Sequence, residues 1–179
     1  MKCLNEESSV NEELRMKSEE SSVHGDSSFS ILHSSFNKYY LGLGTNLGDK
    51  EENLRTAVRL LEERVGKVTS LSAFYATEPW GFTSANAFLN AAAELHTSLS
   101  PLEVLARTQE IECMMGRRHK SVNGVYADRV IDIDLLLCFD ASGALIRMNT
   151  KELTLPHPLM GQREFVMKPL REVFRDYSD

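Results

Sequence analysis

The fold of this chain depends on one segment, YADRVIDIDLLL at residues 126–137. Its β-branched and aliphatic residues alternate with other types, which is the period-two pattern of a β-strand. Residues two apart on a strand point to the same face, so we expect Asp132 and Asp134 to project together. The opposite, buried face is expected to hold four aliphatic residues: Ile131, Ile133, Leu135 and Leu137.

The two carboxylates of this strand allow a functional and a structural interpretation. Rigidly held carboxylate oxygens suit a hard divalent cation such as Mg²⁺. Arg129, upstream of Asp132, offers a permanent cation for bidentate contact with a phosphate. A half-solvated strand whose outward positions are acidic would need neither ligand. An isolated D-x-D pattern favours the structural interpretation, so the rest of the chain has to decide.

Composition is typical of one globular domain: 179 residues, 42% hydrophobic and 26% charged. A net charge of -6 argues against a general nucleic-acid-binding surface. The three cysteines show no metal-ligand spacing. The chain has no apolar run of membrane-spanning length, and its first residues lack the apolar core of a signal peptide. We therefore expect a cytoplasmic protein that binds neither membrane nor nucleic acid.

Residues 1–37 are rich in Ser and Glu and show no sustained periodicity. This composition is typical of a disordered N-terminal extension, because it buries too little apolar surface to fold alone. The folded domain is therefore expected over residues 38–179.

The domain shows an alternation of strand and helix signals. Helix starts are indicated at Asp49, with Glu52 three residues on, and at Ser100-Pro101 with Glu103. The expected order is a strand at 38–44, a helix at about 50–64, strands at 71–75 and 88–95, a helix at 101–115 and the strand at 126–137. This order predicts an α+β fold of the ferredoxin-like βαββαβ type, an antiparallel sheet with helices packed on one face and extra C-terminal segments.

Two other patterns remain ambiguous when taken alone. The G-x-G at Gly42 and Gly44 matches neither a P-loop nor a dinucleotide fingerprint, so close packing against this strand is the favoured interpretation. Phe88 and Asn90 share a strand face and could hold a flat heterocycle by stacking and hydrogen bonds. A core aromatic residue beside a satisfied Asn is the more ordinary explanation.

Five motifs nevertheless occur together and in order: YLGLGTNLG at 40–48, TEPWG at 77–81, GRR at 116–118, R-x-x-D-I-D at 129–134 and LPHP at 155–158. Together they resemble the 6-hydroxymethyl-7,8-dihydropterin pyrophosphokinase family of folate biosynthesis, over about residues 39–173. The resemblance implies a Mg²⁺-dependent transferase that moves pyrophosphate from ATP to 6-hydroxymethyl-7,8-dihydropterin. The products would be the pterin diphosphate and AMP.

The resemblance also implies roles for individual residues. Catalytic roles would fall to Arg117, Arg129, Asp132 and Asp134, with Asp132 and Asp134 holding two Mg²⁺ ions. ATP would be bound by Gln109, Glu112, Arg117, Arg118, Tyr126, Arg129, Thr154, His157 and Arg163. In the basic loop, His119 could take the place of Arg118. The pterin would be bound by Thr77, Pro79, Trp80, Phe88, Asn90 and Phe165, and sandwiched between the rings of Phe88 and Phe165.

The chain departs from the family pattern before the arginine, where an aromatic residue, Gly and Pro often stand. Here the sequence is Tyr126-Ala127-Asp128, so Asp128 would add a negative charge near the triphosphate. Two other functions remain as alternatives. An RNA-binding module shares the βαββαβ order but needs exposed aromatic residues and a basic sheet face. A ferredoxin-like regulatory domain would bind a small ligand without turnover and would form no AMP. We expect a monomer whose partners are its two small-molecule substrates.

Overall fold

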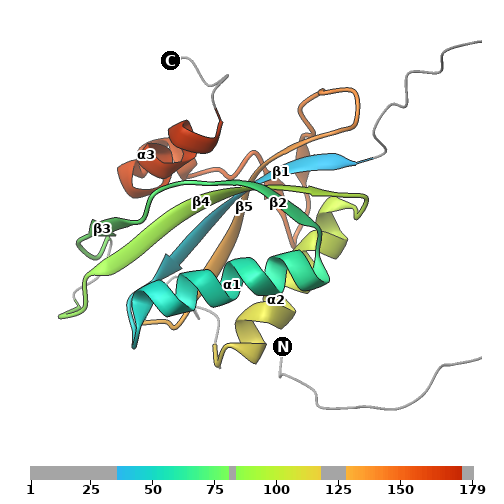
Figure 1. Cartoon of the computed structure of the whole chain (residues 1–179). Helices are drawn as coiled ribbons and strands as arrows, with labels where there is room; N and C mark the ends of the chain where they lie inside the picture. Colours follow the sequence, from blue (N-terminus) through green and yellow to red (C-terminus); the bar gives the residue numbers. More distant parts are fainter. Residues whose placement is uncertain (1–35, 81–83, 118–127, 175–179) are drawn as a thin grey trace, which may run out of the picture.

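The computed structural model describes residues 36–80, 84–117 and 128–174 (Figure 1). The extension predicted for residues 1–37 lies outside these ranges except for its last two residues, and Asn37 already belongs to the first strand. The elements are β1 (Asn37–Thr45), α1 (Lys50–Arg64), β2 (Lys67–Leu71), β3 (Tyr75–Thr77), β4 (Phe88–Thr97), α2 (Pro101–Met114), β5 (Asp132–Phe139), β6 (Met148–Asn149), β7 (Thr154–Leu155), a 3₁₀ helix η1 (Met160–Gln162) and α3 (Glu164–Val173).

The main sheet has the strand order β2-β4-β1-β5, and β3 pairs with β4 beyond the end of β2. All of these pairs are antiparallel. Helix α1 connects β1 to β2, and helix α2 connects β4 to β5, so the sheet is built from two strand-helix-strand units. The two central strands, β1 and β4, are the first strands of these two units. This is the predicted ferredoxin-like α+β arrangement.

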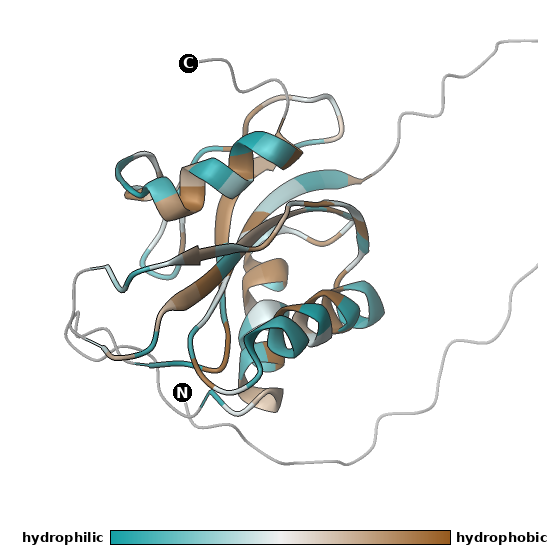
Figure 2. Ribbon diagram, turned by 60° about the vertical axis from the view of Figure 1, so that its left-hand side comes forward, coloured by the Kyte–Doolittle hydropathy of each residue, from teal (hydrophilic) through white to brown (hydrophobic). Residues whose placement is uncertain are grey.

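Helices lie on both faces of the sheet (Figure 1). On one face, α1 and α2 enclose the larger core, and α1 contributes Leu54, Ala57, Leu60 and Leu61 to it. On the other face, α3 packs Met167 and Leu170 against Tyr40 and Ala92. Hydrophilic residues occupy the outer side of α1, whereas hydrophobic residues run along the central strands (Figure 2). The C-terminal helix is thus the extra segment that partly covers the second face.

Both helix starts follow the predicted capping pattern. The Asp49 carboxylate accepts a hydrogen bond from the Glu52 backbone N–H at 3.1 Å. At α2, Ser100 and Glu103 form a reciprocal capping box, with Pro101 as the first helical residue. These contacts satisfy N–H groups that have no partner inside the helix, which explains why each helix begins at this position.

The strand predicted at 71–75 is wrong, because this segment is a break between β2 and β3. The Ser72 hydroxyl accepts a hydrogen bond from the Ala92 N–H at 2.9 Å, and the Ser72 N–H donates to the Ala92 carbonyl at 2.9 Å. The side chain therefore takes a place that a strand carbonyl would have filled. Strand pairing resumes only at Tyr75, opposite Asn90.

The strand predicted at 126–137 begins later and changes face along its length. It starts at Asp132, and residues 126 and 127 lie outside the described ranges. Pairing with β1 is irregular between Tyr40 and Leu41, whose partners are Leu137 and Leu135. The expectation that Leu137 shares the buried face of Leu135 is wrong, since Leu137 packs on the α3 side and Leu135 on the α1–α2 side. Such a bulge inserts one residue and so reverses the alternation beyond it.

None of the helices in the described part of the chain combines the length and apolarity that a bilayer crossing would need.

Candidate active site

A pocket opens on the second face of the sheet, beside the beginning of α3. It brings together nine of the residues to which the sequence assigned a site role, and residues of β1, β3, β4, β5 and α3 contribute to its lining. Its lining consists of Gly42, Leu43, Gly44, Thr77, Glu78, Trp80, Phe88, Asn90, Ala91, Arg129, Asp132, Asp134, Arg163, Phe165 and Val166.

The register of the adjacent strands β4, β1 and β5 explains this grouping. Gly44 on β1 pairs with Asn90 on β4 and with Asp132 on β5, so the three residues form one row across the sheet. Two positions along β1, Gly42 pairs with Asp134 in the same way. Because the central strand has glycines at both positions, no side chain separates Asn90 from the two carboxylates.

The glycines therefore form the floor of the pocket, a role that sequence analysis did not assign to them. A Cβ atom at Gly44 would lie 3.0 Å from the Asn90 Oδ1, which is tighter than an ordinary contact. At Gly42 the nearest atoms belong to the Leu136 side chain at 3.5 Å. The expectation that something packs closely against this strand agrees with the contact at Gly44.

Aromatic and amide groups line one end of the pocket. Asn90 is buried, and its Nδ2 donates to the Thr77 Oγ1 at 2.8 Å, which holds both side chains in place. The rings of Trp80 and Phe165 lie 6.2 Å apart, centroid to centroid. The Arg163 guanidinium lies 4.8 Å from the centre of the Trp80 ring. This end combines flat apolar surfaces with a fixed amide.

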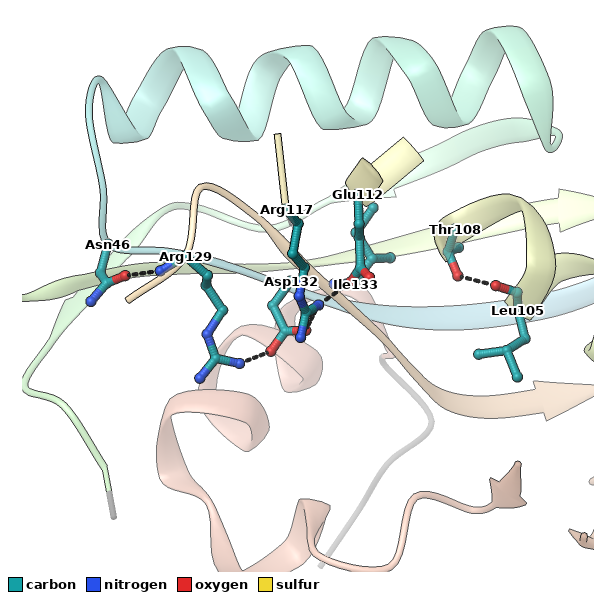
Figure 3. Close-up of polar contacts among 8 residues, drawn as sticks. All are labelled: Asn46, Leu105, Thr108, Glu112, Arg117, Arg129, Asp132 and Ile133. Atoms are coloured by element: carbon teal, nitrogen blue, oxygen red, sulfur yellow. Dashed lines mark hydrogen bonds and ion pairs between the residues drawn. The ribbon is translucent and has the colours of Figure 1, made fainter. Parts of the chain in front are cut away.

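Charged residues occupy the other end (Figure 3). The Asp132 carboxylate forms ion pairs with Arg117 through one oxygen and with Arg129 through the other. These arginine side chains are only 12% and 10% exposed, so the pairs are largely shielded from water. Arg129 also lies against an aromatic ring, 5.7 Å from the centre of Phe88. The arrangement places two permanent cations beside a carboxylate at the pocket wall.

Glu112 on α2 also contacts this cluster. One of its carboxylate oxygens accepts from Arg117 at 2.5 Å and from the backbone N–H of Ile133 at 2.7 Å (Figure 3). Burial raises the pKa of Glu112 to about 7, although the Arg117 guanidinium favours its charged form. The contact therefore ties a buried helix residue to the start of β5 and to the arginine.

Asp134 has a different environment from Asp132. Within the described residues, no hydrogen bond or ion pair joins its carboxylate to another group. Burial, together with the neighbouring Asp132 carboxylate, raises the pKa of Asp134 to about 7. A bound cation would relieve this repulsion, and Asp134 faces the pocket where such a cation could bind.

The described residues contain no group of three or more His, Cys, Asp or Glu side chains that could hold a metal ion by itself. Two carboxylates nevertheless fit Mg²⁺, which usually takes one or two carboxylates and completes its octahedron with water and substrate phosphates. Asp132 and Asp134 therefore fit a metal that binds together with a phosphate group, rather than a permanent all-protein site.

The other described residues predicted for ATP are not part of the pocket lining. The His157 N–H donates to the Leu136 carbonyl at 2.9 Å. Burial, with a further contribution from the Arg163 cation, lowers the pKa of His157, so its imidazole is neutral near pH 7. Gln109 on α2 and Thr154 on β7 do not line the pocket within the described ranges.

Three further predicted residues do not contribute to the described pocket wall. Pro79, predicted for the pterin, adjoins Trp80 but is not part of the lining. Arg118 and Tyr126, predicted for ATP, lie outside the described residues, as does His119.

Sequence analysis missed the role of Asn46. This residue is 2% exposed, and it forms hydrogen bonds with both the backbone N–H and the backbone carbonyl of Arg129. Its Oδ1 accepts from the Arg129 N–H at 2.7 Å, and its own N–H donates to the Arg129 carbonyl at 3.1 Å (Figure 3). The available signal was an Asn placed directly after the glycine-rich strand, where a buried amide needs backbone partners.

Comparison with known proteins adds a second line of evidence. The family model described as 7,8-dihydro-6-hydroxymethylpterin-pyrophosphokinase matches residues 40–175. The chain is 49% identical over 134 residues to the 2-amino-4-hydroxy-6-hydroxymethyldihydropteridine pyrophosphokinase of Porphyromonas gingivalis, covering 75% of this chain and 88% of that protein. It is 42% identical over 135 residues to the protein of the same name from Bacillus subtilis, covering 75% of this chain and 76% of that protein.

Among solved structures, the chain resembles a variant of Plasmodium falciparum HPPK-DHPS determined with SDX-DHP, with a TM-score of 0.60 and 17% sequence identity. The match covers 80% of this chain but only 43% of that longer chain. At this level of identity the likeness concerns the fold alone.

Proposed function

Because the chain belongs to the 7,8-dihydro-6-hydroxymethylpterin-pyrophosphokinase family, we propose that its pocket binds ATP, Mg²⁺ and 6-hydroxymethyl-7,8-dihydropterin side by side. The chain transfers pyrophosphate from ATP to the pterin, giving the pterin diphosphate and AMP, a step of folate biosynthesis. The observation that carries the assignment of the pocket is its division into an aromatic end and a charged end along one floor of glycines.

The pterin occupies the aromatic end in this proposal. Its flat ring lies between Phe88 and Phe165, with Trp80 at the rim. Asn90 offers both a donor and an acceptor to the amide edge of the pterin. Its hydrogen bond to Thr77 orients it for this purpose. The backbone at Pro79 and Trp80 would complete the recognition of that edge. The absence of a side chain at Gly44 leaves Asn90 its position.

The ATP phosphates occupy the charged end. Asp132 and Asp134 would hold two Mg²⁺ ions, which would neutralise and orient the phosphate oxygens. Arg117 and Arg129 would supply fixed cations on the protein side. For this to happen, their guanidinium groups would exchange the Asp132 carboxylate for phosphate oxygens. We assign Gln109, Glu112, Thr154, His157 and Arg163 to the remainder of the nucleotide site, and Arg118 and Tyr126 complete the proposed set.

The reaction needs little covalent chemistry from the protein. The pterin hydroxymethyl oxygen forms a bond to the β-phosphorus of ATP and loses its proton. The bond from the β-phosphorus to the bridging oxygen breaks, and that oxygen leaves with AMP. Charge shifts towards the leaving oxygen during this step, so fixed cations beside the phosphates lower the barrier. The residues of the site therefore act by alignment and by electrostatic stabilisation, with no covalent intermediate.

The test is AMP formation from ATP in the presence of Mg²⁺ and 6-hydroxymethyl-7,8-dihydropterin, with each component omitted in turn. Activity should require all three, and chelation of Mg²⁺ should abolish it. Pterin binding without AMP formation would instead support the alternative of a non-catalytic ligand-binding domain. We further propose that the chain acts as a cytoplasmic monomer, which size-exclusion chromatography with light scattering and localisation of a tagged chain would test.

A further inference from the structure

Asp128 lies at a junction of three segments next to the pocket. One carboxylate oxygen accepts from the Asn46 Nδ2 at 2.6 Å and from the Ser84 Oγ at 2.7 Å. The other oxygen accepts from the Asn86 Nδ2 at 2.9 Å. Through this exposed side chain, the segment that leads into Arg129 is joined to the loop after β1 and to the segment before β4.

These three segments lead to the two ends of the site. Asn46 holds the backbone of Arg129 on both sides, and Arg129 pairs with Asp132 at the charged end. Ser84 and Asn86 precede Phe88, the first residue of β4, at the aromatic end. Arg129 and Phe88 are themselves in contact, at 5.7 Å from guanidinium carbon to ring centre.

We propose that Asp128 is a positioning residue that couples the two ends of the pocket, so that Arg129 and Phe88 are held in one fixed relation. This inference rests on the proposed function, since it takes the charged end as the phosphate site and the aromatic end as the pterin site. It gives the acidic residue that departs from the family pattern a role that does not involve contact with the triphosphate.

The chemistry of the junction explains why an acidic residue suits this position. Three donors converge on Asp128, and a carboxylate has acceptor capacity for all of them, whereas an amide would present a donor to one. The hydrogen bonds from Ser84, Asn46 and Asn86 also lower the pKa of Asp128. The carboxylate therefore stays charged at neutral pH, and hydrogen bonds to a charged group are stronger than neutral ones.

The chain contains a matched control at Asp140. Its Oδ1 likewise accepts three hydrogen bonds, from the Ser142 N–H and hydroxyl and from the Ala144 N–H. Asp140 is in the turn after β5, and it does not line the pocket. Asp140→Ala removes the same number of bonds from an exposed carboxylate without touching the proposed coupling.

The experiment compares Asp128→Ala, Ser84→Ala, the double variant and Asp140→Ala. Pterin affinity is measured through the fluorescence of Trp80, the single tryptophan of the chain, with and without a non-hydrolysable ATP analogue and Mg²⁺. In the unmodified protein the analogue should strengthen pterin binding. In Asp128→Ala this enhancement should fall about fivefold to tenfold, and adding Ser84→Ala should cause little further loss, because both changes break the same link.

Turnover provides the second measurement. Asp128→Ala should lower kcat about tenfold, whereas Asp140→Ala should leave it unchanged. The proposal is overturned if Asp128→Ala behaves like Asp140→Ala, or if the effects of Asp128→Ala and Ser84→Ala on the enhancement simply multiply. Should Asp128→Ala fail to fold, Asp128→Asn keeps the shape and should reduce the enhancement in part. Absence of AMP formation by the unmodified chain would refute the proposed function instead, because the binding measurement does not depend on turnover.

Discussion

Asp132 and Asp134 project from the same face of β5, but their charges are balanced differently. Asp132 is held by the Arg117 and Arg129 guanidinium groups, one on each oxygen. Within the described residues, Asp134 has no hydrogen bond or ion pair, and its pKa is raised to about 7 by burial and by Asp132. Two carboxylates that form one motif therefore have opposite effects on the stability of the metal-free protein.

Substitution of each carboxylate by its amide should separate these effects. Asp132→Asn leaves two largely buried arginines without their shared anion, so we expect a loss of roughly 3 kcal/mol, as for other broken buried ion pairs. Asp134→Asn removes a repulsion and should keep or raise the thermal midpoint. If the Asp132 and Asp134 carboxylates hold the metals, the rate of AMP formation should fall at least about a hundredfold in both variants. A fully active variant with ordinary Mg²⁺ dependence would contradict the metal assignment.

The stability of the metal-free protein should also depend on pH through Asp134. Its pKa is higher in the folded chain than the ordinary 3.8, so the folded state favours the protonated form. The contribution to stability is therefore fully present below about pH 4 and is lost as the pH rises through about 7. Chemical denaturation at pH 5 and pH 8 in the presence of chelator would measure it.

Two comparisons isolate the contribution of Asp134 to this slope. Asp134→Asn should flatten the decline relative to the unmodified chain, and Mg²⁺ together with ATP should oppose it at pH 8. An equal slope in the unmodified chain and the variant would show that other groups cause the dependence.

Gly44→Ala should affect pterin binding selectively. The added methyl group would lie 3.0 Å from the Asn90 Oδ1 and would displace the amide from its hydrogen bond with Thr77. We expect KM for the pterin to rise about fivefold to tenfold, the scale of one buried hydrogen bond, with little change for ATP. Gly161→Ala is the control, because no atom lies within 4 Å of its added Cβ and Gly161 is not in the pocket lining. An equal rise in both KM values would argue against a local effect on Asn90.

Glu112→Gln should show that Glu112, which is not part of the pocket lining, affects turnover by holding Arg117 in place. The amide oxygen can still accept from the Ile133 N–H, but the charge that pairs with Arg117 is lost. We expect a stability loss of about 1–3 kcal/mol and a fall in kcat of about tenfold, since Arg117 would be held less firmly. Glu110→Gln breaks only the exposed pair with Arg107 and should change neither quantity appreciably. Unaltered turnover in Glu112→Gln would limit Glu112 to a structural role.

Local sequence determined where most elements lie and what kind they are. Asp49 and Ser100 predicted the helix starts because a cap satisfies N–H groups within the same turn. The strands predicted at 38–44 and 88–95 correspond to β1 and β4, even though β4 contains three consecutive alanines. The motifs around Arg129, Asp132 and His157 also indicated the family, which the matches over residues 40–175 confirmed.

Only the tertiary structure decided which side chains meet. The row of Asn90, Gly44 and Asp132 depends on the register of three strands, and the reversal at Leu137 depends on a bulge opposite Tyr40. The junction at Asp128 joins residues that are 42 to 82 positions apart in the chain. Helix caps and strand alternation are set by neighbouring residues, so they can be predicted from a short window. Register, bulges and long-range hydrogen bonds are set by the packing of the whole sheet against its helices, and no local pattern specifies them.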